Sequence, residues 1–371
     1  MRIAVYTVQQ LPELIQTDFF KKSPILPISS HRAISHFHNP RAQADDQVLW
    51  LLFEQDTDTT EKLVAYRLVL PDVVYQGDQA IRMAWVSCVY VDPKCRGKGY
   101  GQQLTQLALK AWQGRLMGTE FAPASLAMYR KMGFRDFRNS EGFRGYLRLY
   151  LAILLPKRFP KLHFIKPFLW LGDMLVNGLQ NTRLFFYKNT LDASISIQKS
   201  NKINGFAWDF IQSRQTHELT RRHQTELHWM LQLPWIIRPY QDKNNEAPRF
   251  HFSAFDEVFE QFCLYIFYKK KLIGVLIITH RGEQLKIPYA YFDKPQTALI
   301  AAVIKQYCLD LKIKTLTIYQ PWLSEYMRHH AKPFMYHKTI TRHYLYGTGF
   351  SEELKNQEAA IQDGVGDAGF T

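Results

Sequence analysis

The sequence predicts an α/β or α+β protein built from two units of similar fold. Its 371 residues suffice for about two or three domains of roughly 150 residues each. Hydrophobic residues make up 46% of the chain and charged residues 22%, which excludes a mostly disordered chain, a collagen-like repeat and a coiled coil. In both halves a series of strand-like segments is followed by a helix and a further strand, so one architecture is expected twice.

In the first half, apolar and β-branched runs predict strands at residues 3–8, 48–53, 63–70 and 81–91. Helical spacing predicts helices at 11–22, 102–112 and 124–131. The polar stretch 55–60 predicts a turn between the second and third strands. Residues 143–155 are also strand-like, so we expect this domain to end near residue 150.

The second half repeats this order loosely. It predicts strands at 257–268, 271–279, 287–292 and 314–319, and an amphipathic helix at 297–311. The repeated order indicates a duplication of fold rather than of sequence. We therefore expect four regions: an N-terminal domain at 1–150, a linker and helix at 151–200, a second domain at 201–350, and a polar, mobile tail at 351–371.

The most informative motif is V-Y-V-D-P-K-C-R-G-K-G-Y-G at residues 89–101. A predicted strand ends here, glycines follow at 97, 99 and 101, and a helix begins near residue 102. Glycine lets the backbone take a positive φ and pass close to a ligand, and a helix N-terminus offers free amides to an anion. The motif therefore predicts a pyrophosphate cradle. Its spacing is neither that of a Walker A loop nor that of a dinucleotide-binding G-x-G-x-x-G.

The pattern V-x-V-x-P-x-x-R-G-x-G-x-G resembles the acetyl-coenzyme A signature of the GNAT N-acetyltransferases. Residues 127–134, A-M-Y-R-K-M-G-F, resemble a second element of that family, A-x-x-L-Y-x-x-x-G-F. The resemblance implies two GNAT-like units, each a mixed, largely antiparallel twisted sheet flanked by helices. It also implies acetyl-coenzyme A as the cosubstrate and no metal.

The same resemblance assigns roles to individual residues. The pyrophosphate would be lined by Arg96, Gly97, Lys98, Gly99, Tyr100 and Gly101. The backbone groups of Val89 and Val91 would meet the pantetheine arm across a splayed strand. Tyr129 would protonate the departing thiolate, or, as the alternative, would serve as a core aromatic or a wall of the acetyl pocket.

Two positions depart from the family pattern. Ala122 stands where the family often has an asparagine, and the strand 81–91 carries no carboxylate where many members place a base. Glu54 and Asp92 are the nearest acids in sequence, and neither is favoured as that base. The general base is therefore left open.

The second unit resembles a degenerate copy. Residues 227–235, L-H-W-M-L-Q-L-P-W, resemble a W-R-x-x-x-P-W stretch at the start of the second unit in some tandem bacterial proteins. Residues 290–295 precede the second predicted helix without any R-G-x-G-x-G. The second unit is thus expected to act as structure, dimer surface or substrate wall, without binding coenzyme A in the usual way.

These observations predict an acetyl-coenzyme A-dependent N-acetyltransferase that transfers directly to the amine of a small molecule or peptide. Two other classes stay open: a non-catalytic acyl-coenzyme A-binding scaffold, and a membrane-surface acyltransferase acting on a glycan or lipid precursor. The second alternative depends on the basic, aromatic stretch 156–170, which suits an anionic interface. The favoured interpretation of this region is a linker that leads into a helix at 168–180 packed between the two domains.

The formal net charge of +14 favours anionic partners. Nucleic acid is not favoured, because the basic residues are spread over both halves. A cytoplasmic location is expected, since the N-terminus lacks the features of a signal peptide.

Other histidine, arginine and cysteine side chains are not expected to form a metal site, a disulfide or a nucleophile. The three histidines at 31, 36 and 38 lack a metal-ligand pattern and are predicted to be solvated or to belong to a substrate loop. Residues 221–223, R-R-H, are predicted to form a solvated helix face. The four cysteines are scattered, so no disulfide scaffold is expected, and Cys88 and Cys95 are predicted to pack rather than to act as nucleophiles.

Overall fold

The computed structural model describes residues 1–55, 61–187, 191–351, 354 and 359–370, and the chain divides into two compact units. Unit 1 comprises Met1–Ser140, Asn201–Gln261 and Arg342–Thr371. Unit 2 comprises Glu141–Ser200 and Phe262–Thr341. Neither unit is continuous in sequence, and residues 201–261, expected at the start of the second domain, belong to compact unit 1. The sequence-derived domain ranges remain a prediction, because compactness does not by itself define an evolutionary domain.

The strands of unit 1 follow one another in the order β1 (Arg2–Thr7), β2 (Gln47–Gln55), β3 (Glu61–Gln76), β4 (Gln79–Val91), β5 (Leu116–Thr119) and β12 (Tyr336–Tyr346). Strand β12 belongs to this unit from Arg342 onward. All neighbours are antiparallel except β4 and β5, which are parallel. Residues 48–53 of β2 are buried in succession, because helices cover both faces of the sheet.

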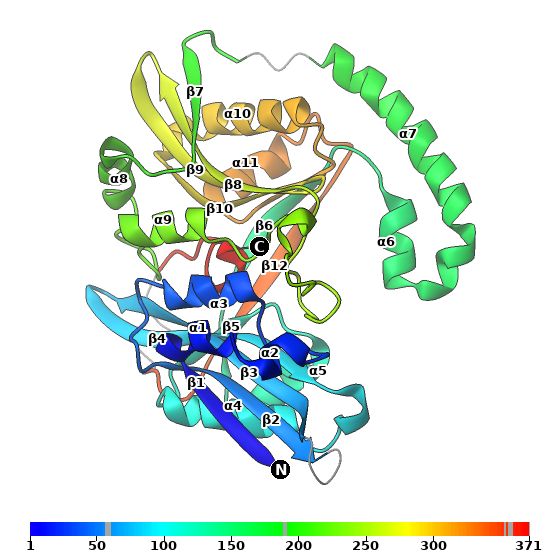
Figure 1. Ribbon diagram of the computed structural model, residues 1–371. Helices are drawn as coiled ribbons and strands as arrows, with labels where there is room; N and C mark the ends of the chain where they lie inside the picture. Colours follow the sequence, from blue (N-terminus) through cyan, green and yellow to red (C-terminus); the bar gives the residue numbers. More distant parts are fainter. Residues whose placement is uncertain (56–60, 188–190, 352–353, 355–358, 371) are drawn as a thin grey trace. The chain divides into compact units, whose positions relative to one another are not determined.

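Figure 1 shows the two helical layers of unit 1. Helix α4 (Tyr100–Ala111) lies on one face of the sheet, and α1 (Leu11–Leu14), α2 (Asp18–Lys22) and α3 (Ser30–Phe37) lie on the other. The single helix predicted at 11–22 is thus two short ones, with Thr17 capping the second through a hydrogen bond from Phe20 N. Unit 1 also contains α5 (Pro123–Lys131), α8 (Gly205–Gln212) and α9 (Gln224–Gln232).

Strand β4 separates from β5 soon after the two strands meet. Their pairing is restricted to Ala84 with Leu116 and Trp85 with Met117. On the other side, Arg67 of β3 is paired with Val89, whereas Val69 is paired with Val86, so β4 carries one extra residue at 87–88. This bulge redirects the strand and leaves residues 87–91 without pairing to β5. The opening that follows is the place where a ligand can reach the strand.

Unit 2 contains a sheet of the same kind. Its order is β6 (Arg135–Tyr146), β11 (Thr315–Ile318), β10 (Gln284–Phe292), β9 (Lys271–Arg281), β8 (Phe259–Tyr268) and β7 (Ile195–Ser200). Strands β10 and β11 are parallel, and β11 and β6 are antiparallel. The helices of this unit are α6 (Leu151–Arg158), α7 (Lys166–Phe186), α10 (Thr297–Asp310) and α11 (Pro321–His329).

The duplication predicted from the sequence is confirmed by the order of elements. The series β2-β3-β4-α4-β5-α5-β6 recurs as β8-β9-β10-α10-β11-α11-β12. The last strands are exchanged: β12 pairs with β5 in unit 1, and β6 pairs with β11 in unit 2. Each unit is a mixed, largely antiparallel sheet flanked by helices, as the sequence predicted.

One expectation about the ends of these repeats is wrong. Residues 143–155 are not one strand: β6 ends at Tyr146, and α6 begins at Leu151. The start of β6, R-D-F-R-N-S-E-G, is polar and gave no apolar signal, and the same is true of β12. The turn was expected at 55–60: Gln55 is the last residue of β2, and residues 56–60 lie outside the described residues.

The predicted mobile tail is also wrong for residues 359–370. Most of these residues are buried in unit 1, and the Phe370 ring stacks on Trp235 with centroids 4.3 Å apart. The backbone is held as well, because Leu219 N donates to Ala360 O at 2.9 Å. A few apolar residues in a polar segment are therefore enough to fix it to the core.

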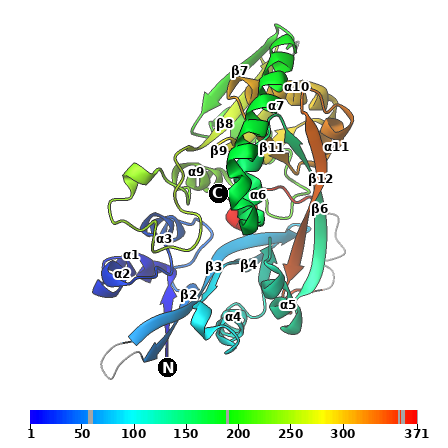
Figure 2. The same ribbon diagram turned by 90° about the vertical axis from the view of Figure 1, so that its right-hand side faces the viewer.

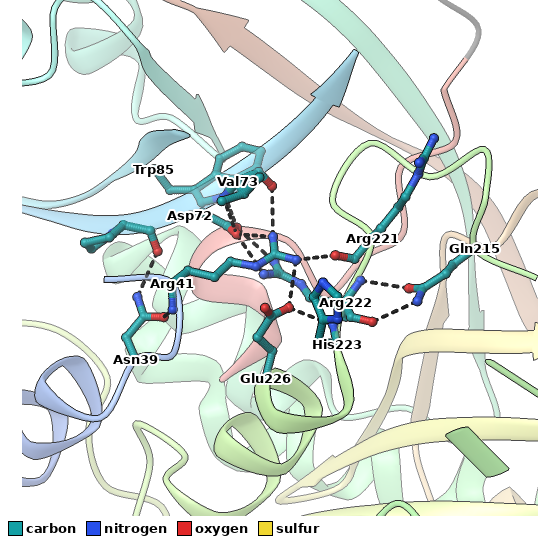
Figure 3. Close-up of polar contacts among 11 residues, drawn as sticks. Asn39, Arg41, Asp72, Val73, Trp85, Gln215, Arg221, Arg222, His223 and Glu226 are labelled. Atoms are coloured by element: carbon teal, nitrogen blue, oxygen red, sulfur yellow. Dashed lines mark hydrogen bonds and ion pairs between the residues drawn. The ribbon is translucent and has the colours of Figure 1, made fainter. Parts of the chain in front are cut away.

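A buried charge cluster fixes residues 215–226 to strand β3 of unit 1 (Figure 3). The Asp72 carboxylate on β3 accepts hydrogen bonds from Arg41 Nη1 at 2.6 Å and from both terminal nitrogens of Arg222 at 2.8 and 2.9 Å. Trp85 Nε1 donates to the same carboxylate at 2.7 Å. Arg41 also pairs with Glu226 of α9 at 2.7 Å, so two cations meet two anions. Arg222 is thus buried, and the prediction of a solvated face at 221–223 is wrong for this residue.

The charge state of Asp72 follows from this geometry. Burial by itself would raise the pKa of Asp72, but the Arg222 and Arg41 guanidinium groups outweigh burial and hold that pKa at about 2. A carboxyl group whose pKa is lower in the folded state stabilises the fold at pH values above its unfolded pKa of about 4. This contribution is lost as the pH falls from about 4 to about 2.

We expect Asp72→Asn to lower the free energy of unfolding at pH 7 by about 3–5 kcal/mol, because it leaves buried guanidinium groups without their carboxylate. Urea denaturation followed by circular dichroism measures this loss. Asp78→Asn is the matched control: it removes the fully exposed carboxylate that pairs with Arg221, and we expect less than about 1 kcal/mol. The difference in the free energy of unfolding between Asp72→Asn and the unsubstituted chain should become smaller below pH 4. Equal losses in both variants would contradict the role of Asp72.

Candidate functional site

A cavity of about 500 Å³ lies where β4 separates from β5. Most of the residues predicted to hold the donor line it: Val89, Val91, Arg96, Gly97, Gly99, Tyr100 and Gly101. The remaining wall includes Ala124, Ser125 and Met128 of α5. Two predicted residues, Lys98 and Tyr129, do not line this cavity. The structure therefore brings the strand end, the glycine turn and two helices to one place.

Glycine is required at the positions of the turn for different structural reasons. Gly97 and Gly99 have φ values of +88° and +82°, in the left-handed region that favours glycine. A Cβ added at either one would meet nothing within 4 Å, so the backbone conformation rather than crowding calls for glycine. Gly101 is helical, and its Cβ would lie 3.4 Å from Val91 Cγ2, beside the cavity.

The turn ends as the N-terminus of α4. Gly99 is the N-cap, and the first helical hydrogen bond runs from Gln103 N to Gly99 O at 2.9 Å. The amides of residues 100–102 precede that bond and have no partner inside the helix. These residues line the cavity, and Arg96 adds a positive charge there. This donor set fits a pyrophosphate.

Glu54 of β2 supports the turn. Its carboxylate pairs with Lys98 Nζ at 3.0 Å and accepts a hydrogen bond from the Tyr100 hydroxyl group. These hydrogen bonds, from Tyr100 first and Lys98 second, lower the pKa of Glu54. Lys98 is thereby directed to Glu54, which explains why it does not line the cavity.

Asp92 has a comparable structural role. It pairs with Lys62 Nζ at 2.8 Å and accepts a hydrogen bond from Lys94 N at 2.9 Å. The hydrogen bond from Lys62 is the main reason why the pKa of Asp92 is lowered. Asp92 therefore holds the backbone of the motif, whereas Glu54 holds the side chains of Lys98 and Tyr100.

Tyr129 lies in the core at the inner side of α5. Its ring packs against Phe121 and Phe134 at centroid distances of 5.2 and 5.0 Å. Its hydroxyl oxygen accepts a hydrogen bond from Arg67 Nη2 at 2.6 Å. Because the oxygen is the acceptor in this bond, the phenolic proton is left to donate to another group.

Arg67 is an unusual residue that sequence reasoning missed. It is fully buried on β3, and its register partner on β4 is Val89. Within the described residues its Nε and Nη1 atoms have no hydrogen-bond partner. A buried guanidinium with unused donors marks a place where a polar or anionic group can be received. The only sequence signal was one arginine inside an apolar strand.

A second cavity of about 200 Å³ adjoins the same strand. It is lined by Trp85, Val86, Ser87, Cys88, Thr119, Glu120, Phe252, Gly366, Asp367 and Ala368. Its β4 residues end at Cys88, and those of the larger cavity begin at Val89. One strand thus provides consecutive residues to both cavities.

Asp367 is held at this second cavity by Ser87 and Arg32. Ser87 Oγ donates to its carboxylate oxygens at 2.6 and 2.8 Å, and Arg32 Nη2 lies 3.3 Å from Oδ2. Arg32 also donates to Ser87 Oγ at 2.5 Å, and its guanidinium lies 3.7 Å from the Trp235 ring centroid. The Asp367 side chain is 38% exposed, so a ligand can reach it. No local sequence pattern points to this residue, which is 280 positions from Ser87 along the chain.

Other candidate groups have structural roles. Cys88 and Cys95 are buried, and burial raises the pKa of Cys88 to about 11, so this thiol stays protonated at neutral pH. His36 is not solvated as predicted: it is buried against Trp235, and burial lowers its pKa well below the usual value. No group of three or more potential metal ligands occurs in the part of the chain that the structure describes.

Comparison with known proteins agrees with this geometry. Residues 48–136 match the family model described as an acetyltransferase (GNAT) domain. The chain is similar to the structure of a GCN5-related N-acetyltransferase from Anabaena variabilis ATCC 29413, with 15% identity and a TM-score of 0.51, over 93% of this chain and 72% of that chain.

A second similar structure is a conserved protein of unknown function from Enterococcus faecalis V583, described as a probable N-acyltransferase. The identity is 11% and the TM-score 0.50, over 92% of this chain and 72% of that chain. No curated protein sequence matches the chain. The two structures share its fold.

Proposed function

We propose that this chain, which belongs to the GNAT acetyltransferases through its domain at residues 48–136, transfers the acetyl group of acetyl-coenzyme A to an amine. The observation that carries the proposal is that consecutive residues of β4 line two cavities, the smaller one up to Cys88 and the larger one from Val89. The larger one suits a donor with a pyrophosphate. The smaller one contains a carboxylate and suits a small cationic acceptor group.

The donor would be held by backbone groups more than by side chains. The amides at the start of α4 and the Arg96 side chain would bind the pyrophosphate. The backbone groups at Val89 and Val91 are free of β5 and would meet the pantetheine arm. Fixing the thioester beside the acceptor is worth several kcal/mol, on the order of 7–11 kcal/mol at most, through orientation alone.

Transfer needs two proton movements. The amine nitrogen attacks the thioester carbonyl carbon, the new C–N bond forms, and the C–S bond breaks. A backbone N–H near Val89 would polarise the carbonyl oxygen. Tyr129, whose side chain lies in the core beside the larger cavity's α5 wall without lining the cavity, would give its phenolic proton to the sulfur. The Arg67 guanidinium would stabilise the charge left on the phenolic oxygen.

Asp367 would serve the acceptor. Its carboxylate would bind the ammonium form and take the proton whose loss makes the amine nucleophilic. The second amine proton, lost once the C–N bond has formed, would restore through solvent the proton that Tyr129 gives to the sulfur. Ser87 and Arg32 hold the carboxylate in place. Trp85 and Phe252 provide apolar walls, and a volume of about 200 Å³ suits one small amine group. This assignment supplies the base that the β4 sequence lacks.

Unit 2 would not bind coenzyme A in this way. The segment before α10 is D-K-P-Q at residues 293–296 and contains no glycine. The N-cap of α10, Gln296, has a φ of −85°, in contrast to the +82° of Gly99. The N-terminus of α10 therefore lacks the left-handed glycine turn that precedes α4 in unit 1.

Calorimetric titration with acetyl-coenzyme A tests the donor site. We expect Gly99→Glu to weaken binding at least about tenfold, because a carboxylate would enter the cradle and repel the pyrophosphate. Gly77→Glu is the matched control: Gly77 also has a positive φ and open space around its Cβ, but it lies in the β3–β4 turn. Equal binding by both variants would refute the cradle. If the folded, unsubstituted chain binds no acetyl-coenzyme A, the proposed acetyltransferase activity is refuted.

Steady-state kinetics test Tyr129. We expect Tyr129→Phe to lower kcat about 10²-fold while the affinity for acetyl-coenzyme A stays the same, because only the proton donor is removed. Tyr66→Phe is the control, since it also removes a buried hydroxyl on the same unit, one that has no hydrogen-bond partner in the described chain. An unchanged kcat for Tyr129→Phe would leave Tyr129 with a packing role only.

A paired substitution tests Asp367. We expect Asp367→Asn to lower kcat/KM for the amine about 10²-fold or more, because asparagine keeps the shape but cannot take the proton. Glu120→Gln is the comparison, since Glu120 lines the same cavity but pairs with Arg342 at 2.5 Å. A large loss in Glu120→Gln with none in Asp367→Asn would show that Asp367 is not the base.

A further inference from the structure

The segment Leu151–Phe186 forms a helical arm in unit 2, made of α6, a short 3₁₀ turn and α7 (Figures 1 and 2). The inward stripe of α7 is polar from Asp173 to Gln180, and Leu184 of the same stripe packs in the core of unit 2. Asp173 accepts a hydrogen bond from Ala152 N at 2.9 Å, and Asn177 bonds to both Leu149 N and Leu149 O, at 2.7 and 2.8 Å. Further along, Gln180 donates to Pro333 O at 3.3 Å. These bonds fix which face of α7 points into the unit.

The outward face of α7 is apolar. Phe168, Leu175, Leu179 and Phe186 follow one another at intervals of seven, four and seven residues, and are 75%, 60%, 77% and 74% exposed. Further exposed apolar side chains of the arm are Phe159, Phe164, Trp170, Leu171, Met174 and Phe185. The arrangement is the reverse of a helix that covers a core. An apolar surface this continuous marks an interaction site.

The charge of the segment indicates the kind of partner. Residues 147–190 contain seven Lys and Arg and a single acid, Asp173, so the formal charge is 7 − 1 = +6. Asp173 of α7 is buried against the start of α6, so its carboxylate is not presented to a partner. The basic side chains described as exposed include Lys161, Lys166 and Arg183. An apolar surface in a segment whose charged residues are basic apart from the buried Asp173 complements a layer of anionic lipid headgroups.

We propose that this arm binds the surface of a bilayer containing anionic phospholipid. A second copy of the chain fits less well, because a twofold interface would place the same basic segment against itself. Among the described residues no helix has the length and apolarity that crossing a bilayer requires. The polar stripe along α7 is consistent with a helix that lies in the plane of the interface, with Trp170 at the boundary between lipid and water. The proposal does not depend on the acetyl-transfer function.

Co-sedimentation of the full chain with vesicles tests this proposal. Vesicles of phosphatidylcholine with a quarter phosphatidylglycerol are compared with pure phosphatidylcholine, at low and high salt. We expect strong binding to the anionic vesicles at low salt, and weaker binding at high salt or without phosphatidylglycerol. Both Phe168→Ser/Leu179→Ser and Lys161→Glu/Lys166→Glu should weaken the partition about tenfold or more.

Matched controls come from unit 1. Tyr240→Ser/Val258→Ser removes two exposed apolar side chains, and Lys21→Glu/Lys243→Glu reverses two exposed charges; neither pair should change vesicle binding. Circular dichroism and acetyl-coenzyme A titration verify that each variant is folded. Absence of binding to the anionic vesicles at low salt would overturn the proposal. A dimer in sedimentation equilibrium that Phe168→Ser/Leu179→Ser abolishes would also overturn it, and would assign this face to a second copy.

Discussion

The buried carboxylate of Asp72 is the constraint on which the geometry of unit 1 depends. An ionised group inside a sheet must be paired, and its partners Arg41 and Arg222 come from segments far apart in sequence. The pairing fixes residues 215–226 against β3 and places Trp85 through its indole N–H. Trp85 is also a wall of the smaller cavity. One buried charge therefore links the assembly of the unit to the shape of its candidate acceptor site.

A second constraint is that β4 must serve two purposes at once. Up to Trp85 it belongs to the core and pairs with β5, and after the bulge at residues 87–88 its edge is open. The bulge brings Ser87 to Asp367, while Val89 and Val91 reach the glycine cradle. A regular strand could not do both, because uninterrupted parallel pairing would occupy the edge that the donor needs.

The sequence predicted what local patterns determine. The glycine spacing, the strand before it and the helix after it were found, and seven of the nine predicted site residues line one cavity. Arg67, Ser87 and Asp367 were missed, because their significance arises only when segments 20 to 280 residues apart are brought together. Arg222 and His36 were predicted to be solvated for the same reason: hydropathy treats them as polar and cannot detect a distant carboxylate or a stacking ring. The exchange of β6 and β12 was invisible, because both strands begin with polar residues.

Asp72 and α7 are two exceptions to the ordinary distribution of side chains, and one criterion explains both. A charge in the core is tolerated because the chain itself provides the compensating groups. On α7 the polar side chains are satisfied by backbone groups of unit 2, while the apolar row at Phe168, Leu175 and Leu179 has no such compensation within the described chain. Turning the helix about its axis to bury that row would break the bonds of Asp173, Asn177 and Gln180. The polar contacts therefore hold the apolar face outward, and the described part of the chain leaves the compensating environment to a partner.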